Sequence, residues 1–147
     1  MTGAVQGNLV VPGTTCIGRD QLLGSILEHV AANRLVTLTG VGGVGKTRLA
    51  TEVAATMARE FPEGVWMVAL GAVGEPAAVP AAVATTLGIA PQGETPMIET
   101  VAGTIAGRRL LLVLDNCEHV LDAAVELVDA LLERPGELKI LTTSRQS

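Results

Sequence analysis

The stretch "GVGGVGKT", residues 40–47, constrains the fold more than any other part of the chain. It matches the pattern G-x-x-x-x-G-K-[ST] at every fixed position. Directly before it, residues 35–39 form a short β-branched run, and after it Leu49, Val53 and Met57 recur at helical spacing. The order strand, glycine loop, helix predicts a phosphate-binding loop that follows a buried strand.

The rest of the chain alternates in the same way between continuous apolar runs and amphipathic segments. Further strands are predicted over residues 64–70, 109–115 and 138–144, and further helices over about 20–33, 79–87 and 97–106. Apolar strands that alternate with helices indicate a parallel sheet covered on both faces. We therefore expect an α/β fold of the three-layer αβα kind.

One more helix is predicted between the third and fourth strands, and Pro135 and Gly136 end it. Its two sides differ sharply, and we expect the apolar side to pack on the sheet. The apolar side comprises Leu121, Ala124, Val125, Val128, Leu131 and Leu132, and the opposite stripe comprises Asp122, Glu126, Asp129 and Glu133.

Composition narrows the class of protein. The chain has 147 residues, of which 48% are hydrophobic and 17% charged, so it suits one folded domain. A net charge of -5, with Phe61 and Trp66 as the only aromatic residues, opposes direct nucleic-acid contact by this segment. Two cysteines and no secretory signal favour a cytoplasmic location, and the charge-free run 76–93 is too interrupted by Pro and Gly to predict a membrane span.

Phosphate binding would explain each residue type in the glycine loop. Glycines let backbone N–H groups approach phosphate oxygens, and the following helix N-terminus favours the negative charge. Lys46 can bring a positive charge to the β- and γ-phosphates, and the Thr47 hydroxyl can ligate Mg²⁺. The predicted nucleotide-binding residues are Gly40, Val41, Gly42, Gly43, Val44, Gly45, Lys46, Thr47 and Arg48.

A loop of this type needs an acid on the end of another parallel strand to hold the Mg²⁺, and Asp115 ends the strand predicted over 109–115. Asn116 stands where many such ATPases carry a second acid that polarises the attacking water. Glu118 is the nearest carboxylate that could replace it. Alternatively, Glu118 is an exposed residue at the start of the next helix, stabilised by the helix dipole.

The same stretch, "VLDNCEH", contains Cys117 and His119, which raises the alternatives of a soft-metal site or a cysteine nucleophile. The only other residues of these types are Cys16 and His29, and neither pair has a zinc-like spacing. No activating environment for the thiol is evident beyond His119 itself. We therefore interpret Cys117 as a buried cysteine and His119 as a loop or helix-start residue.

The fourth predicted strand ends in "TTSR", residues 142–145, at the edge of the sheet where ligands of such folds bind. Arg145 could therefore reach the γ-phosphate and respond to its presence. The alternative is an arginine on the solvated end of a strand.

Together, "CIGRDQLL", the strand and glycine loop, "GVWMVAL", "RLLLVLDNCEHVLDA" and "LKILTTSR" resemble the nucleotide-binding domain of STAND-class P-loop ATPases. Within this class, the chain looks most like the NB-ARC-like domain of large bacterial transcriptional regulators with LuxR-type or SARP-type parts. The resemblance implies that Ile17, Gly18 and Arg19 lie against the adenine, that Asp115 is linked to Mg²⁺ and that Arg145 is the sensor arginine. Asp20 replaces the glutamate that many relatives carry after Gly-Arg.

The resemblance also implies the domain organisation. Residues 1–16 would be an extended lead-in, and 17–147 a partial NB-ARC/AAA-like ATP-binding domain, incomplete at its C-terminal end. Members continue with a fifth strand, a helical domain and a winged-helix domain, so we expect this chain to be a fragment. The fifth strand would lie beside residues 35–39, which would otherwise form an exposed, aggregation-prone edge. Nucleotide-dependent self-association is expected of the full-length protein.

Three functions remain open at this point. The first is an ATP-binding switch domain of a transcriptional regulator, which exchanges Mg-ATP and ADP states through slow hydrolysis, with Lys46, Asp115, Glu118 and Arg145 as its catalytic set. The second is a nucleotide-binding module without catalysis, and the third is an AAA+ motor ATPase. ATP is favoured over GTP because the chain contains no Asn-Lys-x-Asp motif.

Overall fold

The computed structural model describes residues 20–40 and 44–145. Its centre is a four-stranded, entirely parallel sheet with the strand order β1-β4-β3-β2. The strands are β1 Leu35–Gly40, β2 Val65–Ala69, β3 Leu111–Asp115 and β4 Lys139–Arg145. The α-helices are α1 Asp20–Ala32, α2 Val44–Met57, α3 Val79–Leu87, α4 Met97–Ile105 and α5 Leu121–Leu132. Short 3₁₀ helices are η1 Ala58–Glu60, η2 Leu70–Ala72, η3 Pro76–Ala78 and η4 Glu118–Val120.

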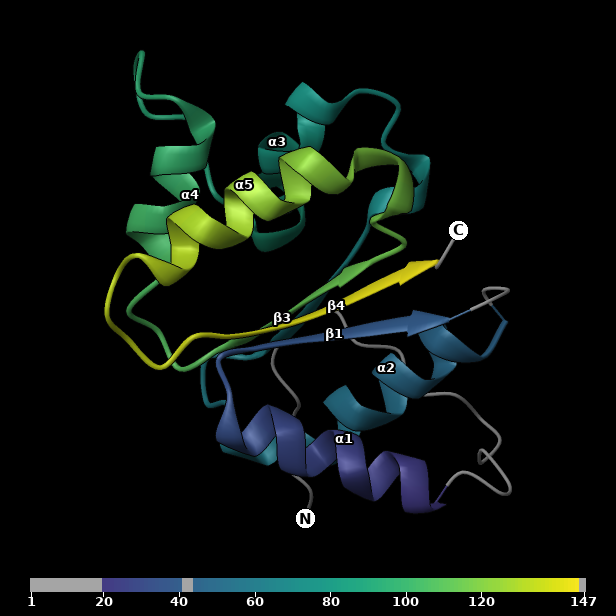
Figure 1. Ribbon diagram of the computed structural model, residues 1–147. Helices are drawn as coiled ribbons and strands as arrows, with labels where there is room; N and C mark the ends of the chain where they lie inside the picture. The colour runs from purple at the N-terminus through teal and green to yellow at the C-terminus, as the bar shows by residue number, and fades with distance from the viewer. Residues whose placement is uncertain (1–19, 41–43, 146–147) are drawn as a thin grey trace.

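Helices cover both faces of the sheet. Figure 1 shows α1 and α2 on one face and α3, α4 and α5 on the other. Successive side chains of a strand point to opposite faces, and β3 follows this rule. Leu111 and Val113 belong to the core beneath α1 and α2, whereas Leu112 and Leu114 belong to the core beneath α3 to α5. The predicted three-layer α/β fold is therefore confirmed.

The strand before the glycine loop lies at an edge of the described sheet. β1 pairs only with β4, in a register that runs from Leu35 opposite Ile140 to Gly40 opposite Arg145. The Leu35 side chain is 38% exposed. The other β1 side chains on the same face of the sheet are also exposed. Among the described strands, residues 35–39 thus form an exposed edge of the sheet, as expected.

The third strand is shorter than predicted, because it begins at Leu111 instead of Arg109. The Arg109 backbone N–H donates to the Glu63 carboxylate at 3.2 Å, and its guanidinium donates to the Glu60 carbonyl at 2.6 Å and to Glu137 at 2.7 Å. These bonds tie Arg109 to neighbouring turns, so ladder pairing begins two residues later.

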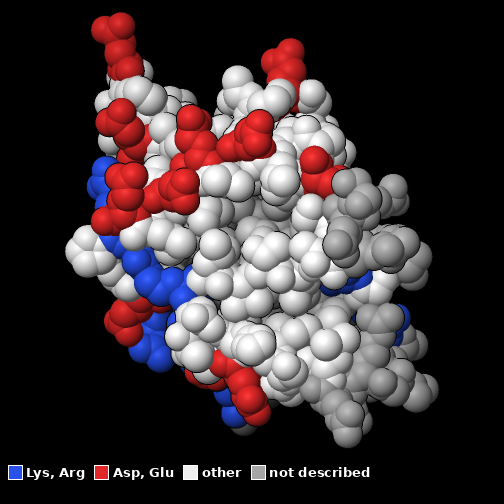
Figure 2. Space-filling model, viewed as in Figure 1, with Lys and Arg blue, Asp and Glu red and all other residues white. Residues whose placement is uncertain are grey.

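The predicted apolar side of α5 is only partly buried. Leu121 and Val125 are 48% and 49% exposed, whereas Leu127, which the pattern did not assign to that side, is fully buried. The reason is the strand order: α5 packs over the middle of the sheet, and no described element covers the face of β1 beside it. In Figure 2 the acidic side chains gather over the upper helices, above an uncharged band.

The start of β4 is anchored to the end of α1. The Lys139 ammonium donates to the carbonyl oxygens of Val30, Ala31 and Asn33, at 2.5, 2.7 and 3.2 Å. Carbonyl groups at a helix C-terminus lack partners in the helix and carry partial negative charge. Lys139 therefore stabilises α1 and fixes it against the sheet.

No helix in the part of the chain that the structure describes is long and apolar enough to cross a membrane.

Candidate functional site

The carboxyl ends of the parallel strands meet at one edge of the sheet, on the right in Figure 1. β1 ends at Gly40, the first residue of the glycine loop, and α2 begins at Val44, near the end of that loop. β3 ends at Asp115, and β4 ends at Arg145, in register with Gly40. The fold thus brings three separately predicted parts of the site to one edge.

Thr47 and Asp115 are in direct contact although 68 residues separate them in the sequence. The Thr47 hydroxyl lies 2.9 Å from Oδ2 and 3.1 Å from Oδ1 of Asp115, to which it donates. Asp115 is only 3% exposed. Val113 and Asp115 share one face of β3, the face that packs against α2, so alternation along the strand directs the carboxylate toward the helix that carries Thr47.

A second threonine, Thr143 of β4, also holds Asp115. Its hydroxyl donates to Asp115 Oδ1 at 2.5 Å and accepts the backbone N–H of Asn116 at 2.9 Å. Its carbonyl oxygen accepts the N–H of Cys117 at 2.9 Å. Thr143 is fully buried. No sequence pattern singles out Thr143. Because β3 and β4 are neighbours with Leu114 opposite Thr142, the strand order is the information that identifies it.

Asn116 stands where many P-loop ATPases carry a second acid, and in this structure it has a structural role. It is the only non-glycine residue with positive φ, at 61°, in the described ranges 20–40 and 44–145. Asparagine tolerates this left-handed conformation better than most residues. Its side chain faces Gly71 of η2, where an added Cβ would lie 3.4 Å from Asn116. Asn116 therefore forms the turn between β3 and η4.

Cys117 is buried, as interpreted from the sequence, and its Sγ lies 3.3 Å from the Leu114 carbonyl oxygen. Burial, and then the neighbouring carboxylates of Asp115 and Glu118, raise the pKa of its thiol from 9.0 to about 12. A nucleophile or soft-metal ligand needs the thiolate, so this cysteine is unsuited to either role. His119 lies in η4, exposed, with Nε2 3.2 Å from the Val73 carbonyl oxygen.

The remaining predicted site residues fall into three groups. Gly45, Lys46 and Arg48 lie in the first turns of α2, with Lys46 buried, and Glu118 is exposed at the start of η4. Only the backbone is described for Gly40, Val44 and Arg145. The positions outside the described residues are Ile17, Gly18, Arg19, Val41, Gly42 and Gly43.

The oxygen atoms at this site suit a hard cation that also coordinates a bound ligand. Thr47 and Asp115 offer hydroxyl and carboxylate oxygens side by side, and Mg²⁺ prefers oxygen ligands. Within residues 20–40 and 44–145, no group of three or more His, Cys, Asp and Glu side chains could hold a metal alone. Mg²⁺ typically binds through one or two protein oxygens together with phosphates and water, and the residues present fit that arrangement.

A parallel sheet, a glycine loop that opens α2 and a buried acid at the end of β3 define an α/β domain of the P-loop nucleotide-binding class. The NB-ARC domain family matches residues 19–147. The chain belongs to the NB-ARC family of nucleotide-binding domains.

The chain is similar in sequence to several longer bacterial proteins. The chain is 40% identical to the protein Rv0894 of Mycobacterium tuberculosis over 91% of its own length and 34% of that protein. It is 46% identical to a candidate HTH-type transcriptional regulator of M. tuberculosis, Rv0890c, over 80% of its length and 13% of the regulator. The regulatory protein AfsR of Streptomyces griseus is 36% identical over 72% of this chain and 11% of AfsR. The chain thus spans about a third or less of these proteins.

Solved structures support the fold. The ORC2 protein of Aeropyrum pernix, solved in ADPNP and ADP complexes, superposes with a TM-score of 0.66 and 16% identity, covering 94% of this chain and 43% of ORC2. Cdc6p of Pyrobaculum aerophilum gives a TM-score of 0.65 at 15% identity, covering 93% and 41% of the two chains. At this level of identity the likeness concerns the fold alone.

Proposed function

We propose that this domain binds Mg-ATP and Mg-ADP and serves as the switch of a longer transcriptional regulator, with slow hydrolysis that resets its state. The observation that carries the proposal is the contact of Thr47 with Asp115. The last residue of the glycine-loop motif and the acid that ends β3 touch directly, in an NB-ARC domain. Regulators among the relatives support the wider context.

Each proposed role follows from the chemistry of the residue. The glycine loop and Lys46 would bind the phosphates, while Thr47 and Asp115 would hold the Mg²⁺, which neutralises charge on the phosphates when bound. Arg145, in register with Gly40, would respond to the γ-phosphate. Ile17, Gly18 and Arg19 would contact the adenine, in keeping with the family resemblance. Glu118 is proposed to activate the water, because Asn116 cannot accept a proton.

Binding of a fluorescent ATP analogue, with Mg²⁺ and with EDTA, tests the proposal. Lys46→Ala should weaken binding in both conditions, whereas Thr47→Val should weaken it only in the presence of Mg²⁺. Thr56→Val is the matched control, since Thr56 lies on the same helix with an exposed hydroxyl bonded to the Glu52 carbonyl. The proposal is refuted if the unmodified chain binds neither ATP nor ADP, or if binding is indifferent to Mg²⁺.

Release of labelled phosphate separates a switch that hydrolyses ATP from a binding module without catalysis. The position of Asn116 favours the second candidate, because the residue in the second-acid position packs against Gly71 in a turn. Turnover that Glu118→Gln abolishes supports hydrolysis. Tight binding without release above background supports the binding module, and turnover stimulated by DNA would instead indicate a motor ATPase.

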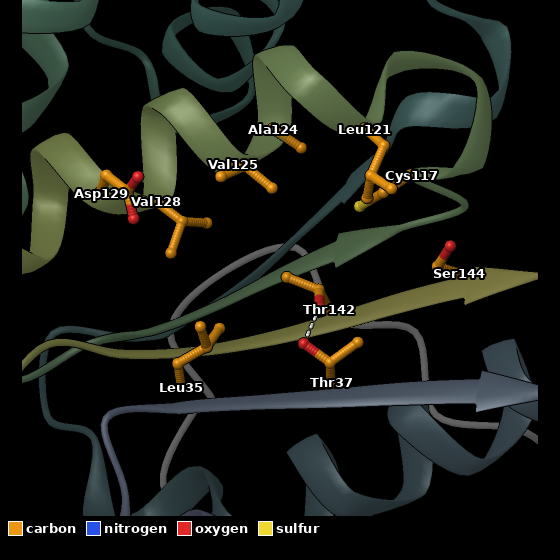
Figure 3. A pocket seen from close by; sticks show the side chains of 10 residues that line it. All are labelled: Leu35, Thr37, Cys117, Leu121, Ala124, Val125, Val128, Asp129, Thr142 and Ser144. Atoms are coloured by element: carbon orange, nitrogen blue, oxygen red, sulfur yellow. Dashed lines mark hydrogen bonds between the residues drawn. The ribbon is translucent and has the colours of Figure 1, made fainter.

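No described element pairs with the outer edge of β1, and this edge suits a contact with another part of a longer protein. Between this edge and α5 lies an apolar groove of about 120 Å³, which Figure 3 shows from close by. Leu35 and Thr37 of β1 line one side, and Leu121 and Val125 of α5 line the other. We propose that in the full-length protein a further strand pairs with β1 and covers this groove, ahead of the helical and winged-helix regions. Nucleotide-dependent self-association belongs to the same full-length context.

A further inference from the structure

We infer that Thr143 is a positioning residue for the magnesium-bound nucleotide, a role that rests on the proposed function. Its hydroxyl bonds both to the carboxylate of Asp115 and to the turn that follows it. Thr143 would not touch the metal. It would act through Asp115, which it holds in the orientation that faces Thr47.

The Thr143 hydroxyl donates one hydrogen bond and accepts another. The Thr143 hydroxyl has one proton, and the Asn116 N–H occupies an acceptor site on its oxygen. The proton is therefore directed to Asp115 Oδ1, at 2.5 Å. With this bond in place, Oδ2 stays turned toward Thr47, at 2.9 Å. A valine at this position would have nearly the same shape but would remove both bonds.

Thr143 also anchors the turn after Asp115. Asn116 adopts φ 61°, and its N–H and the N–H of Cys117 donate respectively to the hydroxyl and the carbonyl oxygen of Thr143. One residue of β4 thus satisfies two consecutive backbone groups of this turn. Glu118, the proposed base, follows directly, so its backbone position depends on the same anchor.

Burial makes both bonds effective. Thr143 is fully buried and Asp115 is 3% exposed, so water cannot readily replace either partner. Residues that hydrogen-bond to a metal ligand without touching the metal typically change metal affinity 10- to 100-fold when they are mutated. The adjacent Thr142 provides the contrast: its hydroxyl lies on the opposite face of the sheet and bonds to Thr37 at 2.8 Å.

The test measures magnesium coupling directly and does not require turnover. The affinity of the chain for a fluorescent ADP analogue is measured with excess Mg²⁺ and with EDTA, and the ratio is the coupling. Thr143→Ser keeps the hydroxyl and loses the methyl group, whereas Thr143→Ala loses both. The two variants therefore differ from each other only in the hydroxyl oxygen. We expect the ratio to be unchanged in the serine variant and about tenfold lower in the alanine variant. Affinity in EDTA should stay within about twofold in both, and Thr142→Val should behave like the unmodified chain.

The outcomes distinguish the two proposals. If the unmodified chain shows no Mg²⁺-dependent binding, the proposed function fails and the role of Thr143 fails with it. If the unmodified chain shows coupling but serine and alanine variants have equal ratios, only the role of Thr143 is overturned. Amide hydrogen exchange gives an independent readout, since the Asn116 N–H should exchange faster in Thr143→Ala than in Thr143→Ser. Equal exchange in the two variants would also overturn the inference.

Discussion

The left-handed backbone conformation of Asn116 predicts how substitutions at this position change the free energy of unfolding. With φ at 61°, a residue with a Cβ is strained by about 1–2 kcal/mol, and asparagine less so. Two hydrogen bonds from the turn to Thr143 offset this strain, each worth about 1 kcal/mol net. We predict that Asn116→Val lowers the free energy of unfolding by about 1–2 kcal/mol, because valine meets the full steric conflict. Asn116→Gly should change it by less than about 0.5 kcal/mol, because relief of strain offsets the greater freedom of glycine in the unfolded chain.

Urea denaturation followed by fluorescence measures this difference, because the chain contains a single tryptophan, Trp66, which is half-buried on β2. The midpoint of Asn116→Val should fall with an unchanged slope, as expected when stability alone changes. Asn116→Asp serves as the matched variant, since aspartate tolerates the same backbone conformation. If Asn116→Val is as stable as Asn116→Gly, the turn is not strained and the reasoning is wrong.

Three further predictions concern groups other than the proposed phosphate and magnesium ligands. In a Cys16→Ser background, Cys117 should resist iodoacetamide at pH 8 in the folded chain and react once urea unfolds it, because burial raises the pKa of its thiol to about 12. Since this folded-state pKa lies above the ordinary 9.0, the free energy of unfolding should hold below pH 9 and fall as pH rises from 9 toward 12; equal labelling rates before and after unfolding would contradict both statements. Lys139→Met should cost about 1–2 kcal/mol in urea denaturation, because three carbonyl groups at the end of α1 lose their charged donor; an unchanged midpoint would show that water replaces the ammonium. The exposed edge of β1 predicts that this chain self-associates, and Leu121→Lys combined with Val125→Lys should reduce that association in sedimentation velocity, because both side chains are about half exposed beside the edge. A variant that associates as strongly as the original chain would exclude this groove as the cause.

The sequence predicted the type and order of nearly all the elements because their periodicities are strong. A strict strand-loop-helix pattern at residues 35–57 and a buried run that ends in Asp115 left few alternatives for the fold. The boundaries and the exposed face of α5 were less predictable. Hydrophobic spacing placed Leu121 and Val125 on the packed side, but whether a helix residue is buried depends on how far the sheet extends beneath it.

The site was predictable only in part, for a related reason. Thr47 and Asp115 belong to patterns with fixed chemistry, so each could be picked out alone. Thr143 belongs to no such pattern, and its importance appears only when β4 is known to lie beside β3. In the sequence, Asn116 is notable because it lacks the carboxylate of a second acid. The reason for an asparagine here is its left-handed backbone conformation, which a sequence does not reveal.

The strand order also suggests how the site and the rest of the protein could be coupled. β4 lies between β1 and β3, so it contacts both the strand that leads into the glycine loop and the strand that carries Asp115. Thr143 holds Asp115 and the following turn, and two residues later the backbone of Arg145 lies in register with Gly40. A small displacement of β4 would therefore alter the acid, the turn and the start of the loop together. Packed elements tend to switch between discrete arrangements rather than deform gradually. Of the described elements, β4 is therefore the one best placed to connect the proposed nucleotide site with the edge of the sheet at β1.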